Sequence, residues 1–276
     1  MTLRYRPAAG SHAIDVCTVA VRFAATTPPE AFDRIRALAA KLALENDLPA
    51  TEQLALPPQL MNIIGFQLPQ MPVGVVFRRF APNGQAEVDL RCEPSAVTLQ
   101  VRKYEGWTKL MGVLDSTLIQ LVPEYLTALP AITGVSIQYD DRFLGGPVDE
   151  VGPASDLFRE GSPWVTVYDR STTEQWHSHF GIFIREAAEG RELINVNVSV
   201  NDQQLDEGLE RVVSLTLLVA ESFDIPGQSP LIVSQEEGAT AVRNLLVRAR
   251  ARHEQIIEEV LSDTYLQAIN FKKSKR

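Results

Sequence analysis

Two histidines separated by a single serine are the first residues whose types and spacing could do chemistry. His177 and His179 lie in a β-type run, and residues two apart in a strand point to the same face. Two imidazoles on one face, with a carboxylate from Asp169 or Glu186, could bind a metal ion that activates water for hydrolysis. Two histidines at this spacing also arise easily by chance. The favoured alternative is a polar strand face, with both histidines exposed or bonded to cross-strand neighbours.

A third histidine, His253, lies on the apolar stripe of the helix expected at the end of the chain, between Ala249 and Ile257. A histidine on such a stripe is more often a buried side chain bonded to a backbone carbonyl than a catalyst. If a pocket lies between this helix and the sheet, His253 and Tyr139 are the polar groups that could orient a ligand there.

The segment Tyr139-Asp140-Asp141-Arg142-Phe143 is expected to end a strand. Two carboxylates at a strand end can bind Mg²⁺. Adjacent residues in a strand face opposite ways, however, so the two acids act together only if the strand has ended. The favoured interpretation makes Asp140 a turn residue and Arg142 the partner in an ion pair, and Arg142 is kept as a candidate functional residue.

Several motifs are missing from the sequence. There is no G-x-S-x-G nucleophile elbow, no phosphate-binding G-x-x-x-x-G-K-[ST] loop and no G-x-G-x-x-G after a strand, so no cofactor is expected. A net charge of −9 and a pI near 5.1 argue against a nucleic-acid partner bound through bulk charge. No apolar run approaches the roughly 18 residues of a membrane helix, and no signal peptide is visible. A cytoplasmic protein with Cys17 and Cys92 buried and reduced is expected.

The elements that must position these residues follow from hydrophobic periodicity. The first part of the chain predicts the order β-α-β-β-β-α, and the second predicts several strands followed by a long helix. The predicted strands are 13–23, 73–80, 88–92, 97–101, 135–139, 164–168, 176–186, 192–201 and 209–222. The predicted helices are 28–45, 107–125 with a kink or restart at Pro123, and 235–262. A short helix or strand is expected within 60–66, and a linker or long surface loop over 144–163.

This order predicts an α+β fold made of two helix-on-antiparallel-sheet halves that share a core. A single extended sheet fits the same pattern. The expected division is an N-terminal half over 1–130, a C-terminal half over 131–271 with the long terminal helix, and a disordered basic tail over 272–276.

The chain resembles an uncharacterised, sporadically distributed prokaryotic family of about 250–280 residues. The likeness rests on the strand ending Tyr139-Asp140-Asp141-Arg142-Phe143 and on a final helix shaped like Ala251-Arg252-His253-Glu254 to Asp263-Thr264. The family has no established activity, so the resemblance implies a fold and a shared terminal histidine but no reaction.

Three functions follow from these observations. The leading hypothesis is a non-catalytic interaction or regulatory protein that binds a protein partner or another copy of itself; by analogy, such families are often accessory components of mobile or defence loci. The alternative is a small-molecule-binding module with a pocket between the C-terminal helix and the sheet. The second alternative is a metal-dependent hydrolase that uses His177 and His179.

Overall fold

The computed structural model describes residues 3–10, 12–54, 74–129, 131–167, 170–186, 190–206, 208–223 and 231–271. The described strands are β1 (Arg6–Pro7), β2 (Ile14–Phe23), β3 (Ala50–Leu54), β4 (Gly74–Phe80), β5 (Ala86–Glu93), β6 (Ala96–Val101), β7 (Ala131–Pro147), β8 (Trp176–Glu186), β9 (Gly190–Leu205), β10 (Gly208–Ser222) and β11 (Leu231–Ile232). The described helices are α1 (Pro29–Glu45), α3 (Trp107–Ser116), α4 (Leu118–Ala128), α5 (Gln235–Val260) and α6 (Asp263–Ala268), with a 3₁₀ turn at Ala154–Leu157. The predicted α+β class is confirmed.

The strands form one 11-stranded sheet in the order β3-β4-β5-β6-β2-β7-β10-β9-β8, with β1 and β11 paired to β7. Strand β2 pairs with β6 on one side and with β7 on the other, both antiparallel. The sheet is therefore continuous across the boundary expected at residues 130 and 131. Whether the two ranges are separate halves stays a prediction.

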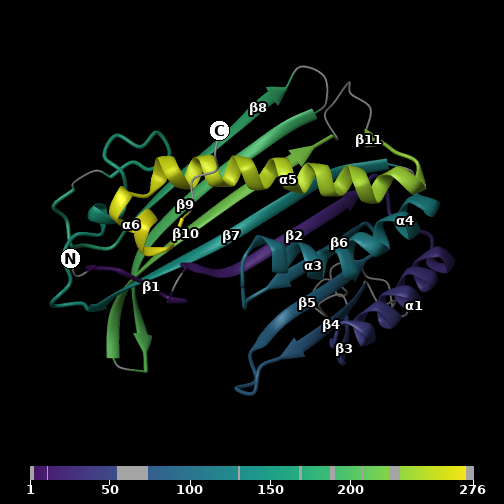
Figure 1. The fold of residues 1–276 in the computed structure, drawn as a ribbon, viewed down its shortest axis with the longest axis horizontal. Helices are drawn as coiled ribbons and strands as arrows, with labels where there is room; N and C mark the ends of the chain where they lie inside the picture. The colour runs from purple at the N-terminus through teal and green to yellow at the C-terminus, as the bar shows by residue number, and fades with distance from the viewer. Residues whose placement is uncertain are drawn as a thin grey trace, which may run out of the picture.

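Alternating side chains give the sheet one buried and one polar face. On β7, Val135, Ile137 and Tyr139 point to the buried face, and the buried residues of β9 and β10 lie in register with them. Helix α5 runs along this face and contacts β7 and β10 (Figure 1), while α4 contacts α5, α1 and β6. The helices and the inner face of the sheet enclose the core between them.

Two local features place α5. A capping box starts the helix: the Ser234 side chain accepts from the Glu237 backbone N–H, and the Glu237 side chain accepts from the Ser234 backbone N–H. One turn later, Gly238 packs directly against α4. A Cβ atom added at this position would lie 2.1 Å from Leu126 Cδ1. The missing side chain lets the two helices approach closely.

The helix expected over 107–125 breaks at a different residue from the one predicted. Thr117, with φ −128° and ψ −93°, separates α3 from α4, and Pro123 lies inside α4. The side-chain amide of Asn46 donates to the Ser116 carbonyl at 3.0 Å, and the Thr117 hydroxyl donates to the Val113 carbonyl. These bonds satisfy carbonyls at the end of α3, so the chain can turn there.

The second half of the chain also differs from the prediction. Strand β7 continues to Pro147 instead of ending near Tyr139, because β2 and β10 pair with it on both sides through Asp141. Asp140 is therefore a mid-strand residue and not a turn residue. The described residues 164–167 form no strand, and the short helix α6, which follows α5, was not predicted.

Some predictions fall on residues that the structure does not describe: the element within 60–66 and the tail over 272–276. Within the described chain, no helix is both long enough and apolar enough to cross a membrane. Cys17 and Cys92 are both buried and carry free thiols, as predicted.

Candidate functional site

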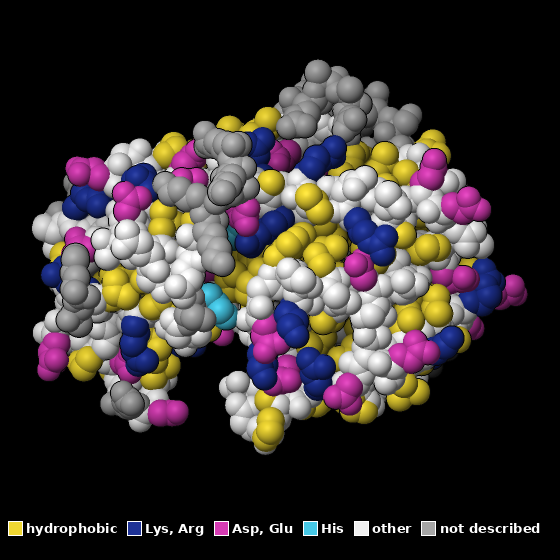
Figure 2. Space-filling view, in the orientation of Figure 1, with side chains coloured by type: hydrophobic (Ala, Val, Ile, Leu, Met, Phe, Trp, Pro, Cys, Tyr) yellow, Lys and Arg dark blue, Asp and Glu magenta, His cyan; other side chains and the backbone are white. Residues whose placement is uncertain are grey.

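A cavity of about 320 Å³ lies between the second half of α5 and the inner face of the sheet. Segments that are far apart in the sequence enclose it, namely the start of β2, the loop before α3, the middle of β7, α5 and the residues after α6. Its lining residues are His12, Ala13, Ile14, Tyr104, Glu105, Gly106, Trp107, Asp141, Arg250, His253, Glu254, Ile257, Ile269, Asn270 and Phe271. The space-filling view of this side of the molecule shows mixed acidic and basic groups and a histidine beside a hollow near the centre (Figure 2).

Asp141 is an acid on the apolar face of the sheet. It continues the inward alternation of β7 and pairs with Leu215 on β10, which in turn pairs with Val198 on β9. The side chain is 4% exposed, and its Oδ2 atom has no hydrogen-bond partner among the described residues. Burial raises the pKa of Asp141 to about 7; the charge of Asp140 adds to this rise, and Arg250 opposes it.

A β-bulge lies directly opposite this acid. Ile14 pairs with Asp141 and Val16 pairs with Asp140, so Asp15 is an extra residue on β2. Bulges re-aim neighbouring side chains and are frequent beside functional sites. Here the bulge lies at the wall of the cavity, where Ile14 and His12 are lining residues.

His253 contributes a buried imidazole from α5. It is 4% exposed, and its ring packs on Tyr139 with 4.1 Å between the ring centroids. Neither ring nitrogen has a hydrogen-bond partner in the described part of the chain. Burial, followed by the charge of Arg250, holds the pKa of His253 well below 6.5, so the ring is neutral at neutral pH and offers one donor and one acceptor. The predicted burial is confirmed, but the predicted bond to a carbonyl is wrong.

Arg250 lies one turn before His253 and carries the positive charge of the cavity. Its Nη2 atom is 2.7 Å from Glu254 Oε1, and its Nη1 atom donates to the Tyr139 hydroxyl at 3.5 Å. The guanidinium carbon is 5.8 Å from the ring centroid of Trp107 and 5.6 Å from that of Tyr139. Glu254 therefore compensates the charge of this arginine within the helix.

The other two candidate residues, Tyr139 and Arg142, lie on opposite faces of the sheet. Tyr139 is fully buried beside His253, on the cavity side. Arg142 belongs to the opposite face, where it donates to Gln203 Oε1 at 2.7 Å, and the described chain gives it no ion pair. The ion pair expected for Arg142 is thus replaced by a hydrogen bond to an amide.

The two histidines of β8 lie far from this cavity in the sheet order, on the edge strand. Both His177 and His179 are exposed, and His179 Nε2 is 2.9 Å from Asn195 Oδ1 across the strand pair. Asp169 lies outside the described residues, so the proposed metal set stays a prediction. No cluster of three or more His, Cys, Asp or Glu side chains suited to a metal occurs in the described ranges.

The sequence did not single out several polar residues of the cavity, among them Asp141 as an inward-facing acid, His12, Tyr104 and Arg250. The sequence did contain a signal for Asp141. The alternation of Val135, Ile137 and Tyr139 places Asp141 on the same inward face, provided that the strand is extended beyond Tyr139. Tyr104 and His12 come from loops, and their rings meet at 5.8 Å only in the folded chain.

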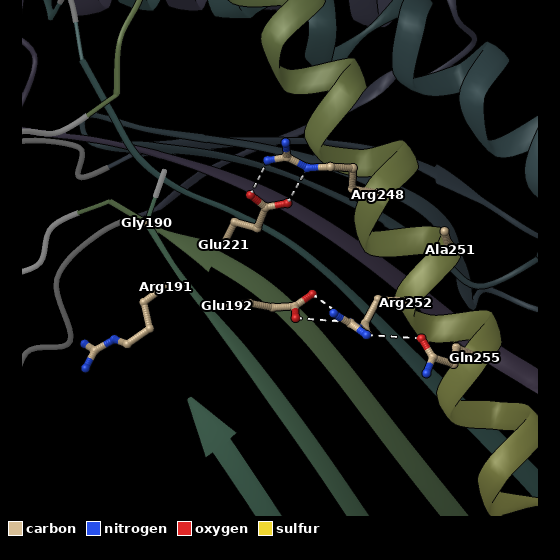
Figure 3. Close-up of a pocket in the computed structure, with 8 residues that line it drawn as sticks. All are labelled: Gly190, Arg191, Glu192, Glu221, Arg248, Ala251, Arg252 and Gln255. Carbon is tan, nitrogen blue, oxygen red and sulfur yellow. Dashed lines mark hydrogen bonds and ion pairs between the residues drawn. The ribbon is translucent and has the colours of Figure 1, made fainter. Parts of the chain in front are cut away.

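A second hollow of about 290 Å³ lies beside the same stretch of α5, over the start of β9 and the end of β10. Four of its charged groups form two ion pairs (Figure 3): Arg248 Nη2 lies 2.6 Å from Glu221 Oε2, and Arg252 Nε lies 3.1 Å from Glu192 Oε2. Arg191 points away from these pairs in the close-up, and its guanidinium lies 4.4 Å from the Phe183 ring centroid. These ion pairs attach α5 to the sheet, and they make this hollow a weaker binding candidate than the first.

Comparisons with known proteins add little to this geometry. No family model matches the chain, and no curated protein matches it. Among solved structures, the chain is compared with the di-domain ARO/CYC StfQ from the steffimycin biosynthetic pathway. That structure is 12% identical, with 88% of this chain and 96% of that chain covered and a TM-score of 0.15. A TM-score this low carries no argument about fold or function, so the likeness to the sporadically distributed prokaryotic family rests on the residues quoted above.

Proposed function

We propose that the protein is a cytoplasmic module that binds a small polar molecule in the cavity between α5 and the sheet. The observation that carries this proposal is the pair Asp141 and His253. Both are 4% exposed, both line the cavity, and both have polar atoms without partners among the described residues. A buried polar group without a hydrogen bond costs about 1–3 kcal/mol, and a ligand that supplies the bond recovers this cost.

The shape of the site agrees with this function. Small-molecule sites are typically concave, mostly apolar, about 300–1,000 Å³ in volume, and contain a few convergent polar groups. Ile14, Ile257 and Phe271 supply apolar walls, and the polar groups converge from β7 and α5. This arrangement favours the binding hypothesis over the metal-dependent hydrolase, whose two histidines are exposed on β8.

A bulky side chain in the wall tests the proposal. Ile14 is half-buried at the cavity, so Ile14→Trp is expected to reduce the space for a ligand without disturbing the strand pairing. Small molecules are extracted from the purified full chain and identified by mass spectrometry. We expect at least one compound that is enriched in the natural protein and depleted by at least about tenfold in Ile14→Trp.

The matched control is Ile232→Trp, which makes the same change on β11 at a position 70% exposed and outside the cavity lining. This variant should retain the compound. Identical extracts from the natural protein and Ile14→Trp would contradict binding at this cavity.

A second candidate function is self-association through β8, in line with the expected protein partner or homo-oligomer. In the described chain β8 pairs with β9 alone, so one edge of the sheet carries unpaired backbone groups. Phe180, Ile182 and Phe183 are exposed on this strand, the last of them by 58%. An edge strand with exposed apolar side chains is a template for pairing with a second copy.

Light scattering coupled to size-exclusion chromatography tests this second candidate. We expect a dimer for the natural chain and a monomer for Phe183→Lys, because the charge must be desolvated in the paired edge. Val247→Lys, at an exposed apolar position on α5, is the control that should remain dimeric. A natural chain that is monomeric at every concentration would rule out this mode of association.

A further inference from the structure

The polar groups of the α5 cavity differ in the charge that they can present to a ligand. His253 is neutral, and the Tyr104 hydroxyl, which has no partner in the described chain, is neutral because burial raises its pKa. Both can donate and accept hydrogen bonds, so they do not select for the sign of a ligand's charge. The groups that can select a ligand by its charge are therefore Asp141, Arg250 and the acids beside them.

The charges of this site sum to a negative value once Asp141 is ionised. Arg250 is paired with Glu254 at 2.7 Å, which leaves Asp141 in the interior and Glu105 at the exposed mouth. Arg250 lies close enough to oppose the rise in the pKa of Asp141, but Asp141 Oδ2 receives no hydrogen bond from any described residue. An anionic ligand beside these carboxylates would be repelled. A cationic ligand with N–H donors would instead donate a hydrogen bond to Asp141 Oδ2.

The walls of the cavity also suit a cation that carries an apolar group. Trp107 and Tyr104 line the cavity, and the position of Arg250, 5.8 Å from the Trp107 ring centroid, shows that a positive charge is accommodated next to this aromatic face. Ile257 and Phe271 offer apolar contact for the rest of the molecule.

We propose that the ligand of this cavity is a small organic ammonium compound whose charged nitrogen binds the carboxylate of Asp141. The inference rests on the proposed function, which requires only that some small molecule binds here. It adds the chemical class, a primary amine with an apolar or aromatic substituent.

Three probes of similar shape and different charge test the inference: benzylammonium, benzyl alcohol and benzoate. Each is titrated into the full chain by calorimetry at a pH of about 8.5, where Asp141 is ionised. We expect benzylammonium to bind at least about tenfold more tightly than the other two probes. Asp141→Asn should abolish this preference. Asp140→Asn removes the same charge from the opposite face of the sheet and should keep it.

The dependence of binding on pH provides a second readout. Protonation of Asp141 removes the carboxylate, so the affinity for benzylammonium should fall as the pH is lowered through about 7. The groups around Asp141 are Asp140 on its own strand, Arg250, His253 and Glu254 on α5, and His12, Tyr104 and Glu105 from the loops. The decisive comparison is Asp141→Asn, in which the change in affinity for benzylammonium near pH 7 should disappear.

The outcomes separate the inference from the proposed function. Preferential binding of benzoate or benzyl alcohol that is lost in Ile14→Trp would overturn the ammonium class and retain the cavity as a binding site. Equal binding of benzylammonium to the natural chain and to Asp141→Asn would also overturn the ammonium class. Failure of all three probes, together with identical extracts from the natural chain and Ile14→Trp, would overturn both proposals.

Discussion

Replacing Asp141 by Asn is expected to stabilise the protein by about 4 kcal/mol at pH 8 and to leave its stability nearly unchanged at pH 4. The folded state holds a proton on Asp141 up to a pKa of about 7, whereas the unfolded chain releases it near 3.8. Each unit of this difference corresponds to about 1.4 kcal/mol. The natural protein therefore loses stability as the pH rises from about 4 through 7, because a buried carboxylate must ionise in the folded state. Asparagine does not ionise, so the variant escapes this loss.

Urea denaturation at a series of pH values measures the effect. The control Asp140→Asn should gain far less, because Asp140 is half-buried and accepts hydrogen bonds from Gln138 and from Thr216 at 2.7 Å. An Asp141→Asn variant no more stable than the natural protein at pH 8 would mean that the carboxylate is solvated or paired, and the argument for the cavity would fail with it. A buried acid that lowers the stability of the ligand-free protein is typical of a functional site.

The second large effect is expected at the pair formed by Arg211 and Asp202, which lie opposite each other on β10 and β9. The Arg211 side chain is 5% exposed; it donates from Nε to Asp202 and from Nη1 to the Thr173 carbonyl. Asp202→Ala leaves this buried guanidinium without a counter-charge, which costs about 3–5 kcal/mol in comparable pairs. We expect the free energy of unfolding to fall by about 3 kcal/mol, measured by urea denaturation at neutral pH.

The stabilising effect of this ion pair depends on pH. The hydrogen bond from Arg211 is the main reason that the pKa of Asp202 is lowered below 3.8, so the pair stabilises the fold above that pH and ceases to do so on acidification. The cost of Asp202→Ala should therefore shrink at low pH. The double variant Asp202→Leu with Arg211→Met should recover at least half of the loss, since it removes both charges; a double variant less stable than Asp202→Ala would contradict this account.

Local periodicity in the sequence determined most of the secondary structure. The residue pattern within 13–23, 176–186 and 209–222 predicted β2, β8 and β10 closely. In β2 and β10 the alternation reflects one buried face and one polar face, whereas the apolar residues of the edge strand β8 are exposed. The apolar stripe of the last helix likewise placed His253 on its buried side. These patterns depend only on which residues along one element face the core, and such information is local.

Element ends were decided by distant partners. Strand β7 passes through Asp140 and Asp141 to Pro147 because β2 and β10 supply hydrogen bonds on both sides, although the local sequence resembles a turn. The break at Thr117 depends on Asn46, a residue 70 positions earlier that bonds to the Ser116 carbonyl. No window of the sequence around either site contains these partners.

The candidate site shows the same division. The sequence by itself determined that the chain has an α+β fold, that Tyr139 and His253 belong to buried faces, and that the familiar catalytic and phosphate-binding motifs are missing. Only the tertiary structure decided that Asp141 faces inward and that Tyr104, Trp107, His12 and Arg250 line the same cavity. The physical reason is that burial depends on the packing of five separate segments. Burial, together with the charges of neighbouring residues, gives Asp141 and His253 their shifted pKa values.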